Sequence, residues 1–329
     1  MFDDLRRRYV DLAQPRLGSQ VVYATDDFFA DRARLIAPGE PQYFPGKFDD
    51  HGQWMDGWES RRRRTPGHDW CVVRLGVPGI VAGFEIDTRH FTGNYPPECQ
   101  LEVCRSDERI PDDDARWVTV TGRVKLKGDD RTYVPIEFGL VTHVRLNIFP
   151  DGGVARLRIW GRAQPDWSRF PAGEVIDLLA MEHGGRGIIA NDEHYGAVNN
   201  LMAPGRGVNM DDGWQTRRRR EEGHDWAILE LGSAGIVEEV VVDTAHFKGN
   251  YPAGCSIQAV PRAEGTPEQI ATEATSWPIL LREAKLRPNA IHHFREEVRR
   301  VGPVRFIRFN IYPDGGVSRL RMMGILAKA

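Results

Sequence analysis

Three short motifs near the middle of the first half of this chain carry side chains that could bind and cleave a small polar anion. Asp56-Gly57-Trp58 leads into a run of four arginines, Arg61 to Arg64, and then into Gly67-His68-Asp69-Trp70. Arginine binds carboxylates through paired N–H donors, and histidine and aspartate can exchange protons near neutral pH. The segment therefore combines a candidate anion site with candidate acid and base groups.

The segment Ile86 to Phe91 ends a predicted strand with further polar side chains. Strict alternation puts Thr88 and His90 on the core-facing side of the strand end and Asp87 on the other side. A polar pair at the mouth of a β-sandwich often marks a ligand pocket. A buried His90 that only holds the next loop would give the same pattern. Asn94 follows in a Gly-Asn-Tyr-Pro turn, where its role could be purely conformational.

Another candidate pair lies on the strand that leads into Asn147-Ile148-Phe149-Pro150-Asp151-Gly152-Gly153. The apolar residues of this strand alternate with Arg145 and Asn147, so these two side chains share one face. An arginine and an asparagine on one face can bind a carboxylate together with a neutral amide. A solvated outer face followed by an ordinary turn is the competing interpretation.

Structural explanations also exist for the first motifs. For His68 alone, a hydrogen bond to a carbonyl is the more common role, and Trp70 is typical of core packing at a strand start. On a strand, only two of the four arginines can share a face and form an anion site. The others would be solvated or paired with Asp and Glu.

All of these motifs occur twice in the chain. The central ones return shifted by 156 residues, as Asp212-Gly213-Trp214, Arg217 to Arg220, Gly223-His224-Asp225-Trp226, Asp243-Thr244, His246-Phe247 and Gly249-Asn250-Tyr251-Pro252. The shift changes on either side of this window. It indicates about ten extra residues within Glu40 to Gln53 of the first copy and about seven around Ala263 to Trp277 of the second. Such insertions are expected in loops.

Short alternating segments indicate antiparallel strands with one buried face. Residues 71–75, 80–87 and 144–149 are examples, with Ile80 and Phe84 on the apolar side. The chain is therefore predicted to be all-β, with two tandem jelly-roll β-sandwich domains from an internal duplication, residues 1–163 and 170–329.

The last strand of each copy and two short helices complete this prediction. In residues 154–161 and 317–324, alternation puts the leucines inward and Arg156, Arg158, Arg319 and Arg321 outward. Helix is expected only in short pieces, Asp3 to Leu12 and Glu174 to Met181.

Composition excludes several function classes. A formal net charge of −3 gives no basic excess for a nucleic-acid partner, and no apolar stretch is long enough for a membrane span. The charged N-terminus does not predict a secretory signal. The four cysteines lack a C-x-x-C pair, which favours free thiols in a reducing cytoplasm. His51, His68 and His90 are too dispersed to predict a metal site.

These motifs resemble the allantoicase (allantoate amidinohydrolase) family. The matching text is MDGWESRRRR and GHDW, GFEIDTRHFTGNYPP, and VRLNIFPDGGVARLRIWG, with their second-copy versions and the opening ATDDFF at Ala24 to Phe29. The resemblance covers nearly the whole chain. It implies two tandem jelly rolls similar to galactose-binding-like modules, a homo-oligomer, and hydrolysis of a linear amidine C–N bond. The reaction would convert allantoate to ureidoglycolate and urea in the allantoin branch of purine degradation.

Allantoate carries a carboxylate and two ureido groups on one carbon, which suits the candidate residues. Arginine would bind the carboxylate, and Asp and Asn the ureido groups. A histidine would protonate the leaving nitrogen while an aspartate activates water. The predicted catalytic residues are Asp56, His68, Asp69 and His90. The predicted substrate-binding residues are Arg61, Arg63, Asp87, Asn94, Arg145 and Asn147, with no metal and no cofactor.

The first copy is the favoured site of reaction. It has the longer loop, and its Glu59 and Arg89 become Gln215 and Ala245 in the second copy. The alternative function is a non-enzymatic tandem jelly-roll module that binds carbohydrate, because the fold does not determine the function. A two-metal ureide hydrolase is weaker, since closely spaced metal ligands are lacking in the sequence.

Overall fold

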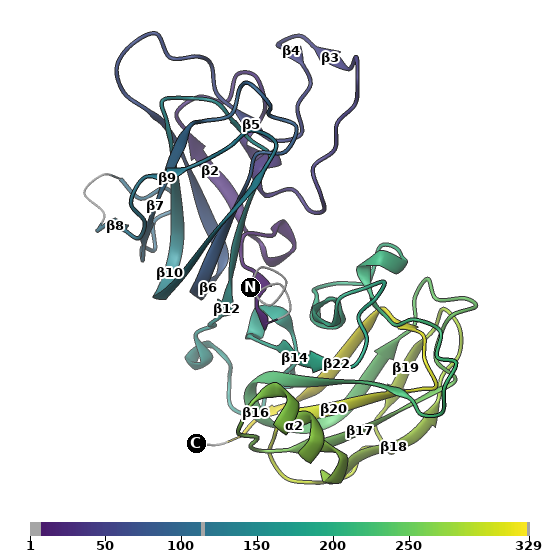
Figure 1. The fold of residues 1–329 in the computed structure, drawn as a ribbon. Coiled ribbons are helices and arrows are strands. Elements are labelled where there is room, and N and C mark those ends of the chain that lie inside the picture. Colours follow the sequence, from purple (N-terminus) through teal and green to yellow (C-terminus); the bar gives the residue numbers. More distant parts are fainter. Residues whose placement is uncertain (1–7, 113–115, 328–329) are drawn as a thin grey trace. The chain divides into compact units, whose positions relative to one another are not determined.

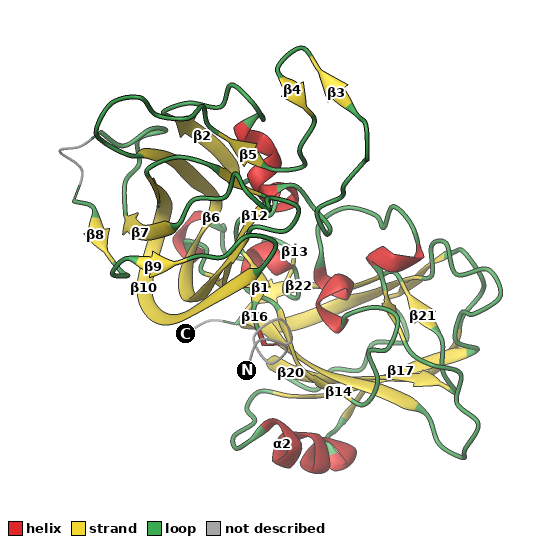
Figure 2. Ribbon diagram, turned by 45° about the horizontal axis from the view of Figure 1, so that its top comes forward, coloured by secondary structure: helices red, strands yellow, loops and turns green. Residues whose placement is uncertain are grey.

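The computed structural model describes residues 8–112 and 116–327. The chain forms two compact units. Asp11–Arg162 is called repeat 1 below, and the part from Ala163 onward, with which the described residues 8–10 are grouped, is called repeat 2. Strands dominate both (Figures 1 and 2). The prediction of two tandem all-β jelly-roll units is confirmed.

The first sheet runs in the order β1-β12-β6-β10-β7-β8, with β2 also paired to β6 and β9 to β7. The strands of this half are β1 (Val10–Asp11), β2 (Gln20–Ala24), β3 (Phe48–Asp49), β4 (Gly52–Gln53), β5 (Trp58–Glu59), β6 (Asp69–Asp87), β7 (Glu98–Cys104), β8 (Val118–Thr119), β9 (Val124–Lys125), β10 (Arg131–Phe149), β11 (Gly153–Val154) and β12 (Arg156–Ala163).

Two long antiparallel strands, β6 and β10, give repeat 1 its layers. Their register runs from Arg131↔Asp87 to Ile148↔Asp69, and bulges interrupt it between Pro135 and His143. Bulges bend a strand and increase its twist, so the two halves of each strand can lie in different layers. The layers enclose side chains that are fully buried, among them Trp58, Phe84, Phe91, Leu101, Leu146 and Ile148.

The same architecture recurs in repeat 2, where the sheet order is β13-β22-β16-β20-β17-β18 and β14 and β19 also pair with β16. Its elements are β13 (Ile176–Asp177), β14 (Arg186–Ala190), β15 (Trp214–Gln215), β16 (Asp225–Asp243), β17 (Gly254–Val260), α2 (Pro267–Glu273), β18 (Ile279–Lys285), β19 (Ile291–Phe294), β20 (Val304–Tyr312), β21 (Gly316–Val317) and β22 (Arg319–Leu326). Two separate strands, β19 and β20, take the place of the single long strand β10.

The two predicted helices have different outcomes. Residues 3–7 of the first lie outside the described residues and Arg8 is helical, but the prediction extends too far, since Val10–Asp11 is a strand. The second is wrong. Glu174 to Met181 contains strand β13 and only the first residue of a 3-10 turn. The helix that does form, α2, lies in the segment predicted to be an insertion loop. Thr266 and Gln269 form a capping box at its start, a signal that the sequence TPEQ already contains.

Apart from Arg8 and α2, the helical segments of the described residues are 3-10 turns. They are Pro15–Leu17, Arg32–Ile36, Trp167–Arg169, Met181–His183, Val198–Met202, Met210–Asp212 and Ala274–Ser276. Among the helices of the described residues, none has both the length and the apolar character needed to cross a bilayer.

Two predictions about side-chain direction are also wrong. Ile80 is 41% exposed while its neighbour Val81 is buried, because a register shift between β6 and β10 falls here. Arg156 and Arg319 were expected to face outward, but they are 2% and 3% exposed. The loop that carries Asp56 covers Arg156, whose guanidinium donates to Asp56 and to the Arg34 carbonyl oxygen.

Candidate active site

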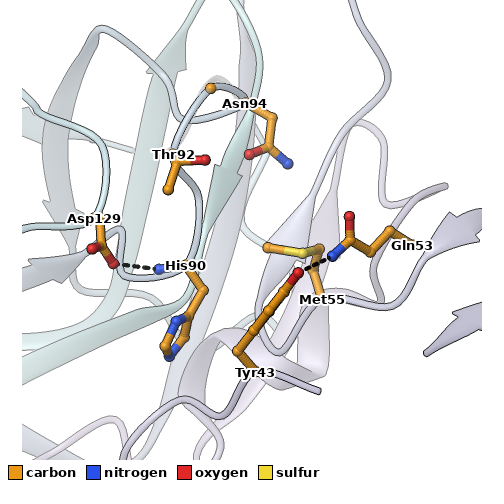
Figure 3. Close-up of a pocket in the computed structure, with 8 residues that line it drawn as sticks. Tyr43, Gln53, Met55, His90, Thr92, Asn94 and Asp129 are labelled. Atoms are coloured by element: carbon orange, nitrogen blue, oxygen red, sulfur yellow. Dashed lines mark hydrogen bonds between the residues drawn. The ribbon is translucent and has the colours of Figure 1, made fainter. Parts of the chain in front are cut away.

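The inserted segment of repeat 1 forms one wall of a cavity of about 550 Å³. Within the insertion, β3 and β4 pair through Phe48 and Gln53, and Figure 1 shows this hairpin standing away from the sheet. Tyr43, Gln53 and Met55 line the cavity on this side. The Tyr43 hydroxyl accepts a hydrogen bond from Gln53 at 2.8 Å (Figure 3), so the insertion presents a fixed polar surface.

The opposite wall is the turn after β6, with His90, Thr92 and Asn94, together with Asp129 from the loop before β10. His90 and Asp129 have φ values of 71° and 54°, in the left-handed region that is uncommon for residues with side chains. The Asp129 carboxylate accepts a hydrogen bond from the His90 backbone N–H at 2.9 Å (Figure 3). Such strained positions cluster at functional sites when the surroundings hold them.

The His90 ring is oriented by a backbone carbonyl. Its Nε2 lies 3.1 Å from the Pro41 oxygen, so Nε2 carries a proton and donates it to this bond. In the neutral ring, Nδ1 then has the lone pair. The ring stacks on Tyr43 with centroids 5.8 Å apart. The residue therefore holds the inserted segment, as the structural interpretation expects, and also lines the cavity.

Asn94 is held by a carboxylate that does not itself line the cavity. Its Nδ2 donates to Glu59 Oε1 at 2.8 Å, which leaves Oδ1 as an acceptor. Burial raises the pKa of the Glu59 carboxyl above its ordinary value, and the bond from Asn94 opposes this shift. Glu59 thus fixes the orientation of the Asn94 amide.

The arginine run is an extended segment and not a strand, so the strand-based expectation is wrong. Arg61 forms an ion pair with Asp26 at 2.6 Å, and Arg63 forms one with the buried Asp69 at 2.7 Å. The Arg63 backbone N–H also donates to the Asp151 carboxylate. Arg62 and Arg64 are exposed and make no hydrogen bond or ion pair within the described residues. These two guanidinium groups can therefore receive an anion without first losing a partner.

Three other predicted residues form a separate cluster on the outer face of the sheet. His68 Nε2 lies 3.2 Å from Asn147 Oδ1, and Asn147 Nδ2 donates to Glu102 at 2.8 Å. Arg145 pairs with the same carboxylate at 2.7 Å. Although burial opposes ionisation, the bonds from Arg145 and Asn147 hold the pKa of Glu102 below its ordinary value. The cluster shares no residue with the cavity lining.

The two remaining aspartates support the framework. Asp56 pairs with the buried Arg156 at 2.7 Å and accepts the Gln42 N–H, which anchors the start of the insertion. Asp87 is 1% exposed and pairs with Arg89 at 2.5 Å. Both carboxylates balance cations that hold loops in place.

The sequence-predicted residues therefore lie in four places. Only His90 and Asn94 line the cavity. Asp56 and Asp87 hold the loops around it, the arginine run with Asp69 lies along the neighbouring extended segment, and His68, Arg145 and Asn147 lie on the sheet face.

Sequence reasoning missed the lining residues Tyr43, Gln53, Thr92 and Asp129. One available signal was the insertion itself, since extra residues confined to one copy must serve that copy. The other was the position of Asp129, because the second copy has Asn289 in its place.

Repeat 2 has the same arrangement of a turn histidine and its hydrogen-bond partners, but amides replace two carboxylates. His246 has a φ of 71°, and its N–H donates to Asn289 Oδ1 at 2.8 Å. Its Nε2 lies 2.7 Å from the Gly207 carbonyl oxygen. Asn289 replaces Asp129, and Gln215 replaces Glu59. The histidine and its backbone contacts are retained, whereas both carboxylates of the first site are lost.

Within the described residues, no three or more His, Cys, Asp or Glu side chains are grouped so as to hold a metal ion. The expectation that no cofactor is needed remains a prediction.

Comparison with known proteins identifies the family. The allantoicase repeat pattern matches residues 10–164 and 176–327. A Burkholderia pseudomallei protein named probable allantoicase 2 is 51% identical over 98% of this chain and 96% of its own length. The probable allantoicase of Pseudomonas aeruginosa is 50% identical over 97% and 96%.

Solved structures agree with this relationship. The crystal structure of allantoicase from Saccharomyces cerevisiae is 34% identical, with a TM-score of 0.78 over 96% of this chain and 93% of that one. Another structure of allantoicase is 33% identical, with a TM-score of 0.79 over 98% and 94%. This chain belongs to the allantoicase family.

Proposed function

We propose that this chain is an enzyme that hydrolyses allantoate to ureidoglycolate and urea, by cleaving a C–N bond of this linear amidine in purine degradation. Relatives named allantoicase at about half identity over nearly the whole length support the proposal. The observation that carries it is the cavity of repeat 1. Its volume of about 550 Å³ suits a small molecule, and it combines a histidine, a carboxylate and an oriented amide.

The chemistry of allantoate matches the groups at this cavity. Asn94 Oδ1 and the Gln53 amide can bond to the N–H and C=O groups of a ureido arm. Arg62, which is outside the cavity lining, is proposed to bind the carboxylate, since its guanidinium, like that of Arg64, has no partner among the described residues. Arg61 and Arg63 hold the run through their own ion pairs. We assign these two, with Asp56, Asp69 and Asp87, to positioning.

A balanced reaction can be written with two lining residues. The Asp129 carboxylate takes a proton from water, and the water oxygen forms a bond to the central carbon. The bond from that carbon to one ureido nitrogen breaks. Protonated His90 gives the Nδ1 proton to this nitrogen, which leaves as urea. Proton transfer from Asp129 through solvent restores His90, and a positioned acid and base of this kind contribute about 10²–10⁴-fold in rate.

The test is urea release from allantoate by the purified chain, compared with His90→Asn and Asn94→Ala. Asparagine tolerates the left-handed backbone at position 90, so loss of rate in His90→Asn reports loss of the imidazole, both its acid role and its bond to Pro41, and not a misfolded turn. We expect a fall of about 100-fold or more. Full activity in both variants would move the reaction away from this cavity. No urea release by the unmodified chain would reject the function itself.

The outer-face cluster of His68, Arg145 and Asn147 is assigned a structural role. Its charges are already balanced around Glu102. A non-enzymatic carbohydrate-binding module is not favoured, because the matching relatives carry an enzyme's name. Tight saccharide binding without urea release would restore that alternative.

Three further properties are proposed with the function. The duplication divides as residues 1–163 and 170–329, and the protein is a homo-oligomer that binds no nucleic acid. It works in the cytoplasm, where its four buried thiols would remain reduced. Light scattering after size exclusion tests the oligomer, since a mass of 37.3 kDa would mean a monomer.

A further inference from the structure

Repeat 2 has a polar cavity of its own, of about 350 Å³. The segment after β15, the turn at Asn250 and the turn before β21 enclose it. The side chains used in the argument below are Gln215, Arg218, Asn250 and Asp314. The cavity lies beside Asn250, on the side that faces the arginine run.

Arg218 is the cation of this cavity, and its charge is not balanced within the described residues. The arginines before and after it are paired, Arg217 with Asp192 at 2.8 Å and Arg219 with Asp225 at 2.5 Å. Arg218 makes no such pair in the part of the chain that the structure describes. It also lines an adjoining cavity of about 370 Å³ that the rest of the run surrounds. The Arg218 guanidinium lies between two paired arginines and lines two cavities, so it is suited to bind a carboxylate.

A simple anion would leave the other polar groups of the cavity without hydrogen-bond partners from the ligand. Gln215 and Asn250 each offer an amide that both donates and accepts. The Asp314 carboxylate accepts the Arg219 N–H at 3.0 Å and can accept further N–H groups. A bare phosphate or sulfate would be repelled by Asp314. A ligand with a carboxylate at one end and a ureido group at the other satisfies Arg218, the amides and Asp314 together.

The cavity lacks the groups proposed to carry out hydrolysis in repeat 1. Gln215 stands where repeat 1 has Glu59, and Asn289 holds His246 where Asp129 holds His90. Each change replaces a carboxylate with an amide of similar size. Of these residues only Gln215 lines the cavity, where the loss of negative charge favours an anionic ligand. His246 and Asn289 are outside the lining, and Asn289 cannot act as the base that Asp129 is proposed to be.

We propose that repeat 2 is a second, non-hydrolytic binding site for small ureido carboxylates, built around Arg218, Gln215 and Asn250. The inference rests on the proposed function for its ligand class, since substrate and product of that reaction are both ureido carboxylates. Each chain therefore binds such a ligand at two places and cleaves it at one.

The test uses N-carbamoylglycine, a stable ureido carboxylate, in calorimetric titrations of the full chain. We expect Arg218→Ala to lose one equivalent of binding per chain, or to bind it about tenfold more weakly. Arg262→Ala removes an exposed arginine of repeat 2 outside the cavity and serves as the matched control, with unchanged stoichiometry. The same stoichiometry and affinity in Arg218→Ala as in the unmodified chain would overturn the proposal.

Further measurements distinguish loss of ureido specificity, misfolding of the variant and failure of the proposed function. Acetate, which lacks the ureido group, should bind the Arg218-dependent equivalent about tenfold more weakly than N-carbamoylglycine. Equal binding of the two would overturn the ureido specificity. Arg218→Gln repeats the titration with a polar side chain in case Arg218→Ala does not fold. Urea release from allantoate is measured separately, so failure of the proposed function is seen independently of the second site.

Discussion

The two repeats share their framework and differ in a few carboxylates. Arg156 pairs with Asp56 and Arg319 with Asp212, at 2.7 Å in both cases. The shared Asp-Gly-Trp motif also has a structural role. Only glycine fits at position 57, because a Cβ there would lie 2.5 Å from the Val154 carbonyl oxygen. The Trp58 Nε1–H donates to the Asp26 carbonyl oxygen. The polar residues that duplication preserved therefore mainly hold loops in place.

The differences include one residue of the cavity lining of repeat 1, Asp129, which becomes Asn289. Glu59, which orients Asn94, becomes Gln215, and Glu40 becomes Arg206. Glu102 of the separate sheet-face cluster becomes Gln258. An amide can replace a carboxylate in a hydrogen bond but cannot take a proton from water. The comparison teaches that, in this molecule, the positions where the copies differ say more about chemistry than those where they agree.

The largest expected effect comes from giving repeat 1 the amide of repeat 2 at position 129. Asp129→Asn should lower kcat for urea release by about 10²–10⁴-fold, because the proposed base is lost. Asparagine accepts the same hydrogen bond and tolerates the same backbone, as Asn289 does at a φ of 47°. Steady-state kinetics with allantoate measure this, and Asn289→Asp is the matched control, with no change in kcat. A variant within twofold of the unmodified enzyme would remove Asp129 from the mechanism.

The next effect should be equal in the two repeats. Arg156→Met and Arg319→Met each remove a buried guanidinium and leave Asp56 or Asp212 without its ion pair. Each should lower the free energy of unfolding by about 3 kcal/mol, the range for breaking a buried pair. Urea denaturation followed by fluorescence measures this. If only one of the two variants lost a large part of its free energy of unfolding, the two ion pairs would not be equivalent in the two repeats.

A smaller effect is expected at Glu59, the carboxylate that orients Asn94. Glu59→Gln, which copies Gln215, should lower kcat/KM about tenfold, the cost of a charge-assisted hydrogen bond. The raised pKa of Glu59 gives the sign of the pH dependence. As pH falls through that pKa, the carboxyl gains a proton and the charge-assisted bond to Asn94 is lost, so kcat/KM falls.

The pH profile of Glu59→Gln should lack this acid limb. Glu137→Gln, at an exposed position on β10, is the control and should keep it. An acid limb that persists unchanged in Glu59→Gln would assign it to another group.

The smallest effect contrasts the buried aspartates at the ends of β6 and β16. Asp87 has both Arg89 and Arg131 within ion-pair distance, whereas Asp243 pairs with Arg206 at 3.1 Å. Arg206→Ala should therefore cost about 1 kcal/mol of stability and Arg89→Ala about half of that, because Arg131 remains beside Asp87. Thermal unfolding of the two variants measures the difference, and the opposite order would contradict the pairing.

Much of the fold could be predicted because its signals are local. Alternation marked the strands, and the changing shift between copies located both insertions. The path of Ile80 and Val81 could not be predicted, since a bulge set by the partner strand reverses the alternation there. Arg156 was misplaced for a related reason. Alternation gives the face of a strand on which a residue lies, but not whether a distant loop covers that face.

The site could be predicted only in part. His90 and Asn94 were found because they end a strand and form a turn. Asp129 was missed because it joins them from a loop about 40 residues further along the chain, a distance that only folding removes. Asn147 was expected on the outer face of its strand, but it is 3% exposed. Its bonds to His68 and Glu102 depend on strand register, which the sequence does not give.

The most direct test of the account is urea release by the double variant Glu59→Gln, Asp129→Asn, which gives repeat 1 the amides of repeat 2 and leaves repeat 2 unchanged. The account predicts a folded chain with less than about 1% of the unmodified rate. A rate of half or more would contradict it, since hydrolysis would then take place in repeat 2 or without either carboxylate.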